Sequence, residues 1–211
     1  LSGDLLGNDQ PNFVNYSDNS GRVVVGAASA ILDGFTIFGG NGQAGAGIYV
    51  TASLMTIKNC VITLNTNSSS GGGAYIRSSV IEDCSIISNR ATNGGGVYIP
   101  VGYSPTLNNV ILRSNTATGE GGGIYNGSTL TFKNCVFDSN AAVTGGAIRN
   151  KMSTTLGGSY YVYFRNCTFY GNTGNGSCIN STESTSLVGT TYVNNYLYNV
   201  ILWGNSGTAL V

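Results

Sequence analysis

The sequence predicts an all-β solenoid of about seven coils, and two alternating motifs carry that prediction. The first is a glycine cluster followed by an apolar residue and often a tyrosine, as in GGGAY (71–75) and GGGIY (121–125). The second places Asn-Cys between apolar positions, as in IKNCVIT (57–63) and FKNCVFD (132–138). The period is roughly 24 to 33 residues, a spacing at which each unit buries its apolar face only by stacking on its neighbours.

Within each unit, the residue pattern predicts short strands joined by tight corners. Helices are disfavoured because Gly, Asn, Ser and Thr are abundant and no 3.6-residue period is sustained. In IKNCVIT, the apolar alternation is interrupted before Cys60, and a corner at Asn59 restores it because Asn readily adopts left-handed backbone angles. The glycines are expected at a corner too tight for a Cβ atom. The inward-facing columns begin at Leu32, Phe35, Ile37 and Ile48 and continue at the matching positions of every later coil.

Asparagine fills two further columns of the stacked repeats. In-register amides of a parallel stack hydrogen-bond from one coil to the next, so we expect asparagine ladders along the solenoid. The first column contains Asn59, Asp83, Asn109, Asn134, Asn166 and Asn199, and the second contains Asn65, Asn89, Asn115, Asn140, Asn172 and Asn205.

The repeats cover nearly the whole chain, so residues 1–211 are predicted to form a single domain. Residues 1–29 read as an irregular N-terminal coil that contains a strand at Val23–Val25. Residues 30–211 hold the repeats, and two inserts, at 151–161 and 181–196, lengthen the last coils. Departures from a repeat often carry the specific function of a solenoid.

Composition excludes several classes of protein. Only 9% of the residues are charged and the formal net charge is zero, so a nucleic-acid binder with a basic face is excluded. No apolar stretch approaches the roughly 20 residues that a membrane-spanning helix needs. Apolar residues make up 41% of the chain and are spread evenly, which disfavours disorder.

The GGG-[IV]-Y and [FIL]-x-N-C-x-[FI]-x-x-N repeats resemble those of secreted bacterial pectin-lyase-like proteins. That group includes polymorphic outer-membrane proteins and cell-surface adhesins. The resemblance implies a right-handed parallel β-helix built from a single chain, and an extracellular or cell-surface location. It does not imply one activity, because the fold hosts lyases, hydrolases, adhesins and structural proteins.

The chain lacks the residues on which polysaccharide-cleaving enzymes of this fold depend. It contains no histidine, the commonest general base. Asp33, Lys58 and Glu82 share one outward column, and Arg113 and Asp138 share another, which favours surface ion pairs over paired catalytic carboxylates. We therefore predict no catalytic residues and no enzyme activity.

Neither a metal nor a cofactor is predicted. Asp4, Asp9 and Asp18 lie in the irregular N-terminal segment, where calcium binding competes with the more common turn and capping roles. Cys60, Cys84, Cys135 and Cys167 share an inward column, where strand spacing exceeds the Cβ separation of a disulfide, and Cys178 has no partner. All five cysteines are therefore expected to be buried thiols.

Outward aromatic residues are the candidates for ligand or interface contacts. Tyr49, Tyr75, Tyr98 and Tyr125 follow the glycine corner on four successive coils, where they either stabilise the strands by stacking or form a recognition surface. Tyr170 and Trp203 form a second outward set near the C-terminal end, as a cap or an interface.

These observations favour a non-enzymatic structural or adhesive protein of the cell exterior. Strand-like sequence at both chain ends also predicts head-to-tail stacking of copies into a filament. The expected partners are therefore another copy of the chain or a surface polysaccharide. The alternative function is a carbohydrate-binding module or a degenerate polysaccharide lyase.

Overall fold

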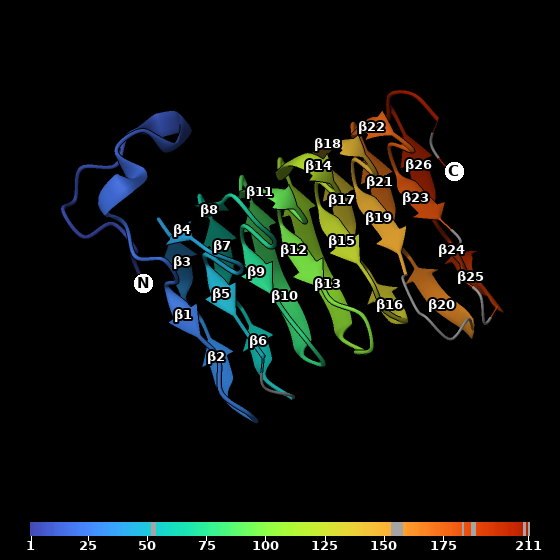
Figure 1. Ribbon diagram of the computed structural model, residues 1–211, viewed down its shortest axis with the longest axis horizontal. Helices are drawn as coiled ribbons and strands as arrows, with labels where there is room; N and C mark the ends of the chain where they lie inside the picture. Colours follow the sequence, from blue (N-terminus) through green and yellow to red (C-terminus); the bar gives the residue numbers. More distant parts are fainter. Residues whose placement is uncertain (52–53, 153–157, 183, 187–188, 209, 211) are drawn as a thin grey trace.

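In the computed structural model, the chain winds into a solenoid whose walls are three β-sheets (Figure 1). The structure describes residues 1–51, 54–152, 158–182, 184–186, 189–208 and 210. All pairings between strands in these ranges are parallel, apart from the antiparallel pair β24 and β25. The predicted parallel β-helix is therefore confirmed.

The first sheet contains the strands that follow the glycine corners. It has seven strands within the described residues, one from each successive coil. Their order along the solenoid is β1 (Val24–Val25), β5 (Ile48–Tyr49), β9 (Ala74–Tyr75), β12 (Val97–Ile99), β15 (Ile124–Asn126), β19 (Ile148–Lys151) and β23 (Ile179–Thr182).

The second sheet contains the Asn-Cys motifs and bends where each asparagine lies. The strands before the bend are β2 (Ile31–Asp33), β6 (Thr56–Lys58), β16 (Leu130–Lys133), β20 (Gly158–Arg165), β24 (Ser184–Ser186) and β25 (Gly189–Tyr198). Those after it are β3 (Thr36–Phe38), β7 (Val61–Thr63), β17 (Val136–Asp138), β21 (Thr168–Tyr170) and β26 (Ile201–Trp203). Two strands, β10 (Val80–Ile87) and β13 (Thr106–Arg113), run through the bend.

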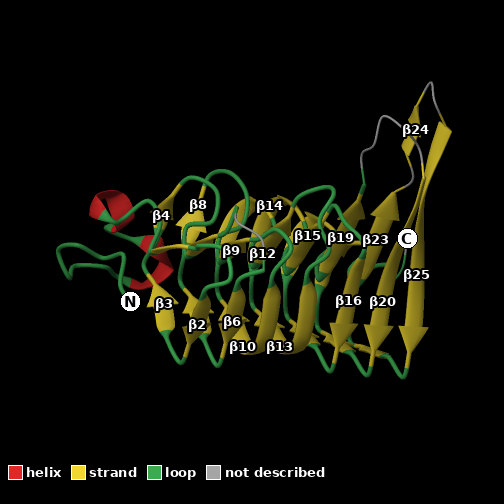
Figure 2. Ribbon diagram, turned by 90° about the horizontal axis from the view of Figure 1, so that it is seen from below, coloured by secondary structure: helices red, strands yellow, loops and turns green. Residues whose placement is uncertain are grey.

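The third sheet closes each coil, and the N-terminal segment packs at one end of the solenoid (Figure 2). Its strands are β4 (Asn41–Gly42), β8 (Thr66–Asn67), β11 (Arg90–Asn93), β14 (Thr116–Glu120), β18 (Ala141–Thr144) and β22 (Thr173–Asn175). The N-terminal segment contains two 3-10 turns, η1 (Pro11–Phe13) and η2 (Tyr16–Asp18). None of the described residues forms a helix long and apolar enough to cross a membrane.

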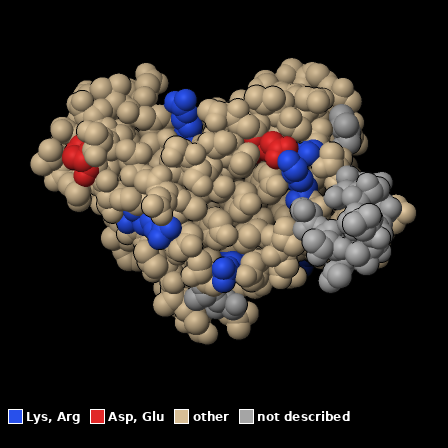
Figure 3. All heavy atoms as spheres, viewed as in Figure 1, with Lys and Arg blue, Asp and Glu red and all other residues tan. Residues whose placement is uncertain are grey.

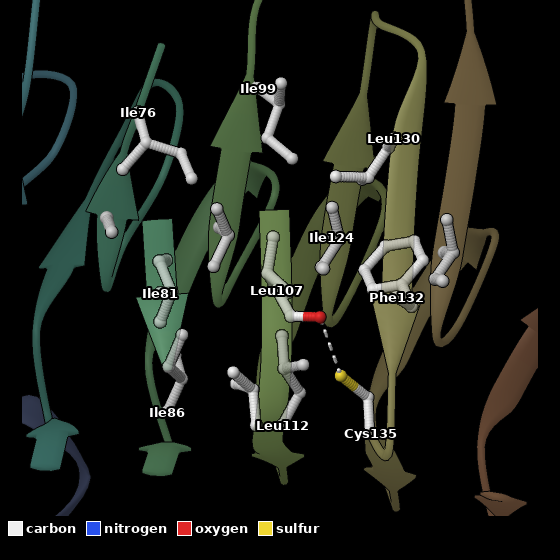
Figure 4. Close-up of a cluster of buried hydrophobic side chains, with 14 of the residues drawn as sticks. Ile76, Ile81, Ile86, Ile99, Leu107, Leu112, Ile124, Leu130, Phe132 and Cys135 are labelled. Carbon is white, nitrogen blue, oxygen red and sulfur yellow. Dashed lines mark hydrogen bonds between the residues drawn. The ribbon is translucent and has the colours of Figure 1, made fainter. Parts of the chain in front are cut away.

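The predicted inward columns form one continuous core. Figure 4 shows Ile81, Leu107 and Phe132 side by side on successive strands, as their pairing register requires. Leu107 is fully buried, as are Ile81 and Phe132. The exceptions lie on the first and last coils: Phe35, Leu197 and Leu210 are 43%, 37% and 46% exposed, because no further described coil packs over them. The expectation that these three residues belong to the core is therefore wrong.

The glycine corner is as tight as predicted. In the 71–73 cluster, Gly71 has a φ of +69°, a conformation that L side chains rarely adopt. A Cβ atom on Gly72 would lie 2.4 Å from the Arg90 carbonyl oxygen, and one on Gly73 would lie 2.6 Å from that of Gly96. The first glycine thus supplies the turn and the next two allow adjacent coils to approach.

Both asparagine columns form, but in different places. The inner asparagine ladder, residues 65, 89, 115, 140, 172 and 205, lies inside the wall; its members up to Asn172 are fully buried. The outer asparagine column, residues 59, 109, 134, 166 and 199 with Asp83, lies at the bend of the second sheet, and every member has a φ between +51° and +53°. The left-handed corner predicted at Asn59 is therefore confirmed for the whole column.

The described parts of both predicted inserts lengthen the second sheet. β20 and β25 pair over eight residues, from Gly158 with Thr191 to Arg165 with Tyr198. Residues 158–161 and 189–196 are thus strand, while residues 153–157, 183, 187 and 188 lie outside the described part of the chain.

Candidate binding surfaces

The tyrosine stripe, Tyr49, Tyr75, Tyr98 and Tyr125, runs along the outer face of the first sheet as predicted. The four residues are in register on β5, β9, β12 and β15. Successive ring centroids are 5.2, 5.3 and 4.8 Å apart, and the angle between ring planes falls from 39° to 12° along the stripe. This spacing follows the strand separation of a parallel sheet, so the rings stack on one another and are only half-exposed.

Charged side chains flank both ends of the tyrosine stripe. The Arg22 guanidinium lies over the Tyr49 ring, 3.6 Å from its centroid, a cation–π contact. At the other end, Arg149 is in register with Tyr125 and is only 5% exposed. Its Nε lies 3.2 Å from Glu120 Oε1, and Lys151 Nζ lies 3.0 Å from Glu120 Oε2.

The hydroxyls of Tyr75, Tyr98 and Tyr125 remain protonated at neutral pH. Burial raises the pKa of Tyr125 to about 12, and the nearby Tyr98 and Glu120 add to that effect. Burial likewise raises the pKa of Tyr75 and of Tyr98. These side chains can therefore donate hydrogen bonds and offer ring faces, but they do not supply a general base at neutral pH.

The second predicted aromatic pair is more exposed than the stripe. Tyr170 on β21 and Trp203 on β26 are in register on the outer face, after the bend of the second sheet. Their exposed fractions are 48% and 70%. The predicted outward orientation of this pair is confirmed.

Five tyrosines that the sequence analysis did not single out lie on the same outer face, before the bend. Tyr161 and Tyr163 belong to β20, and ring centroids of Tyr163 and Tyr196 on β25 are 5.0 Å apart. Tyr192 and Tyr198 also lie on β25, both exposed. Alternate residues of a strand share a face, so the Tyr spacing in YVYFR (161–165) and TYVNNYLY (191–198) signalled this arrangement.

The seven rings together form what we call the C-terminal aromatic surface. It wraps around the bend at Asn199 and covers the last two coils. One positive charge lies next to this surface: the Arg165 guanidinium is 5.5 Å from the Tyr198 ring centroid. Its members are Tyr161, Tyr163, Tyr170, Tyr192, Tyr196, Tyr198 and Trp203.

Charges are sparse on the face shown in Figure 3, which is mostly uncharged side chains. The two predicted surface ion pairs are present. Lys58 Nζ lies 3.4 Å from Asp33 Oδ2, and Arg113 Nε lies 2.7 Å from Asp138 Oδ2. Asp33 and Asp138 thus each form an ion pair with a neighbouring basic side chain on the surface.

All five cysteines are buried free thiols, as predicted. Each of the four in the shared column donates its Sγ–H to the backbone carbonyl two residues before it, for example Cys84 to Glu82 at 3.1 Å. Burial raises the pKa of Cys84 to about 12 and that of Cys178 to about 11. Cys84 and Cys178 are therefore poor nucleophiles at neutral pH.

In the N-terminal segment, Asp4 has the turn role that the sequence favours. Its carboxylate accepts hydrogen bonds from the backbone N–H groups of Gly7 at 2.7 Å and Asn8 at 3.2 Å. A groove of about 840 Å³ separates this segment from the third sheet, with Phe13, Tyr16 and Ala117 among its lining residues. No three His, Cys, Asp or Glu side chains in the described ranges cluster closely enough to hold a metal ion.

Comparison with protein families agrees with this architecture. Residues 12–156 match the family model described as a right handed beta helix region. Neither a curated protein nor a solved structure matches the chain. The match spans the glycine corners up to that at Gly145, the tyrosine stripe and most of the inner asparagine ladder, and it ends before the C-terminal aromatic surface begins.

Proposed function

Because the chain belongs to the right-handed β-helix family, a fold that carries many functions, we propose that it is a non-enzymatic adhesive module of the cell exterior. It binds its partner through the C-terminal aromatic surface. The observation that carries the proposal is the outward exposure of these rings on two adjacent coils.

The exposure of this surface is costly unless a partner covers it. Each aromatic side chain offers roughly 150–250 Å² of surface, and contiguous apolar patches of a few hundred Å² mark interaction sites. Tyr and Trp are also the residues that most often dominate binding interfaces, because their rigid rings lose little entropy when they are covered. Stacking of coils covers ring faces where Tyr163 and Tyr196 stack, but it leaves Trp203 70% exposed and Tyr192 and Tyr198 each 49% exposed.

The ionisable groups support a binding role over a catalytic one. The sequence contains no histidine. The pKa of Tyr125 and that of Cys84 are each raised to about 12, so both groups are protonated at neutral pH. The placement outside the cell rests on the resemblance of the repeats to those of secreted bacterial proteins.

Carbohydrate binding is the second candidate, and the exposed indole of Trp203 favours it. Flat aromatic faces stack on the apolar faces of sugar rings, and Trp203 is 70% exposed and in register with Tyr170. In this case the partner is a surface polysaccharide. For the adhesive module proposed above, the partner is a protein surface, and a second copy of the chain can supply that surface.

Trp203 is the single tryptophan of the chain, so its fluorescence reports directly on this surface. We expect its emission to shift to the blue when the partner covers it. Titration with neutral and uronate polysaccharides tests the carbohydrate candidate, and dilution of the protein from high concentration tests self-association. Adhesion of protein-coated beads to cell-wall material tests the proposed adhesive function.

The Trp203→Ala, Tyr170→Ala double variant should lose adhesion, while Trp203→Phe, which keeps a ring, should retain most of it. Circular dichroism checks that each variant is folded. Adhesion by the folded double variant equal to that of the unmodified protein would show that this surface is not the binding site.

A further inference from the structure

Four buried side-chain oxygens in the N-terminal segment accept no hydrogen bond. They are Asn8 Oδ1, Asp9 Oδ1, Asp18 Oδ2 and Asn19 Oδ1. Buried polar atoms in folded proteins nearly always have a partner, so each exception requires an explanation. All four are oxygens, and they come from two consecutive Asn/Asp pairs on either side of η1.

A hydrogen bond joins the two pairs. Asn19 Nδ2 donates to Asp9 Oδ2 at 2.9 Å and to the Gly39 carbonyl oxygen at 2.7 Å. These two bonds fix the amide orientation, because only its nitrogen can donate to oxygen. Asn19 is 9% exposed, and its Oδ1 is left without a donor beside the Asp9 carboxylate.

The carboxylates of Asp9 and Asp18 also lack a compensating positive charge. No Lys or Arg in the described part of the chain forms an ion pair with Asp9 or Asp18. The charges of Asp4 and Asp18 both act on the Asp9 carboxylate, so the three acids lie near one another. Neighbouring carboxylates that each bury an oxygen without a donor destabilise a fold unless a cation lies between them.

Asp4 lies beside this group, but its carboxylate oxygens already accept hydrogen bonds. The donors are the backbone N–H groups of Gly7 at 2.7 Å, Asn8 at 3.2 Å and Asp9 at 3.3 Å. Asp4 thus adds negative charge to the site without offering free ligand oxygens.

We propose that Asn8, Asp9, Asp18 and Asn19 form a calcium-binding site that fixes the N-terminal segment to the first coil. Carboxylate and amide oxygens are the ligands that Ca²⁺ prefers, and its flexible coordination accommodates two acids, two amides and water. The absence of nearby sulfur or imidazole ligands disfavours zinc. Amide ligands also explain why no cluster of three acidic, Cys or His side chains is found here.

The proposed site lies where the segment joins the solenoid (Figures 1 and 2). Asn19 reaches Gly39 in the first coil, and the neighbouring Tyr16 hydroxyl donates to the Leu64 carbonyl oxygen at 3.2 Å. Calcium bound here would therefore stabilise the packing of residues 1–20 over the end of the core.

Calorimetric titration of the chelator-treated full chain with CaCl₂ tests the proposal. We expect one saturable site for Ca²⁺, weaker binding of Mg²⁺, and an increase in the melting temperature as Ca²⁺ is added. Terbium luminescence sensitised by Tyr16 should appear on Tb³⁺ addition, disappear on excess Ca²⁺, and be reduced in Tyr16→Phe. If the unmodified protein shows neither binding nor a calcium-dependent melting temperature, the proposal is wrong.

Asp18→Asn and Asp9→Asn should each weaken calcium binding by more than about tenfold, because each removes one ligand charge. Asp33→Asn, which removes an exposed carboxylate on the solenoid, is the matched control and should bind calcium as the unmodified protein does. With chelator present, Asp18→Asn should melt at the same or a higher temperature, because carboxylate repulsion is relieved. Tight calcium binding by a folded Asp9→Asn, Asp18→Asn double variant would overturn the assignment.

Discussion

The inner asparagine ladder and the outer asparagine column use the same side chain for different purposes. Asn115, in the ladder, donates to the Ile86 carbonyl oxygen and to Asn140 Oδ1. Its own Oδ1 accepts from both the backbone N–H and the Nδ2 of Asn89. Asn109, in the outer column, is exposed, donates to Asp83 Oδ1 at 2.6 Å and has a φ of +53°.

The difference separates two properties of asparagine. Inside the wall, the amide is required because it satisfies backbone groups that no water reaches. At the bend, the tolerance of asparagine for left-handed backbone angles is required, and its amide contributes little. Asparagine therefore recurs at the two positions of the repeat for two different physical reasons.

The largest effect is expected for Asn115→Ala. The substitution removes four buried hydrogen bonds, two donated by the Asn115 amide and two accepted by it, and takes away the acceptor of the Asn89 backbone N–H. At roughly 1 kcal/mol for each lost hydrogen bond, with a further cost for the unsatisfied N–H, the loss should be roughly 3–5 kcal/mol. Urea unfolding measures it; a loss below about 1 kcal/mol would contradict the role assigned to the ladder.

The buried thiols beside the outer column should make the protein sensitive to alkali. Burial raises the pKa of Cys84 from its ordinary 9.0 to about 12, so the folded state favours its neutral form. That contribution to stability is complete below about pH 9 and is lost as the pH rises toward 12. Cys84→Val, which copies Val110 in the next coil, should move the alkaline unfolding midpoint upward.

Circular dichroism measured against pH follows this transition. Cys84→Val should show little difference from the unmodified protein at pH 7, where the thiol is neutral in both states. Coincident alkaline unfolding curves for the two proteins would contradict the expectation.

A smaller effect is expected for Asn109→Ala at the bend. Alanine loses one exposed hydrogen bond and must adopt the left-handed conformation, which together cost about 1–2 kcal/mol. Asn109→Gly should be less destabilising, because glycine adopts that conformation without strain. If both variants lose equal stability in urea unfolding, the amide and not the backbone angle is what this column requires.

The smallest effect is expected for Arg113→Gln on the outer surface. The substitution removes the ion pair with Asp138, and exposed pairs contribute about 0–1 kcal/mol. The difference between the variant and the unmodified protein should shrink further in high salt. A loss as large as that of Asn115→Ala would show that outer contacts, and not the inner wall, determine stability.

The repeats made most of the fold predictable, because residues of the same kind recur at the same position in successive copies. Register, core and both asparagine columns follow from aligning the copies. Only members of the inward columns on the first and last coils, Phe35, Leu197 and Leu210, depart from their predicted burial. Tyr161, Tyr192 and Tyr196 were missed because the last two coils are longer and their extra residues read as inserts. Tyr163 and Tyr198 lie next to those inserts. In fact, the described parts of those inserts extend the strands.

The proposed calcium site could not be predicted from the repeats, since residues 1–29 contain none. Asp4, Asp9 and Asp18 look alike in sequence, and only their surroundings distinguish them. Asp4 accepts backbone N–H groups, whereas Asp9 and Asp18 each retain an oxygen without a donor. That distinction depends on how the segment folds against Gly39.

The inner asparagine ladder also gives the solenoid a direction. Every hydrogen bond between ladder amides runs from Nδ2 to the Oδ1 of the next member, at 2.9–3.1 Å, in the direction from Asn65 to Asn205, and none runs the other way. The amide dipoles therefore add up along the axis, as peptide dipoles do in a helix. A molecule that continued the row would have to join it in the same orientation, because two like ends would set donor against donor or acceptor against acceptor.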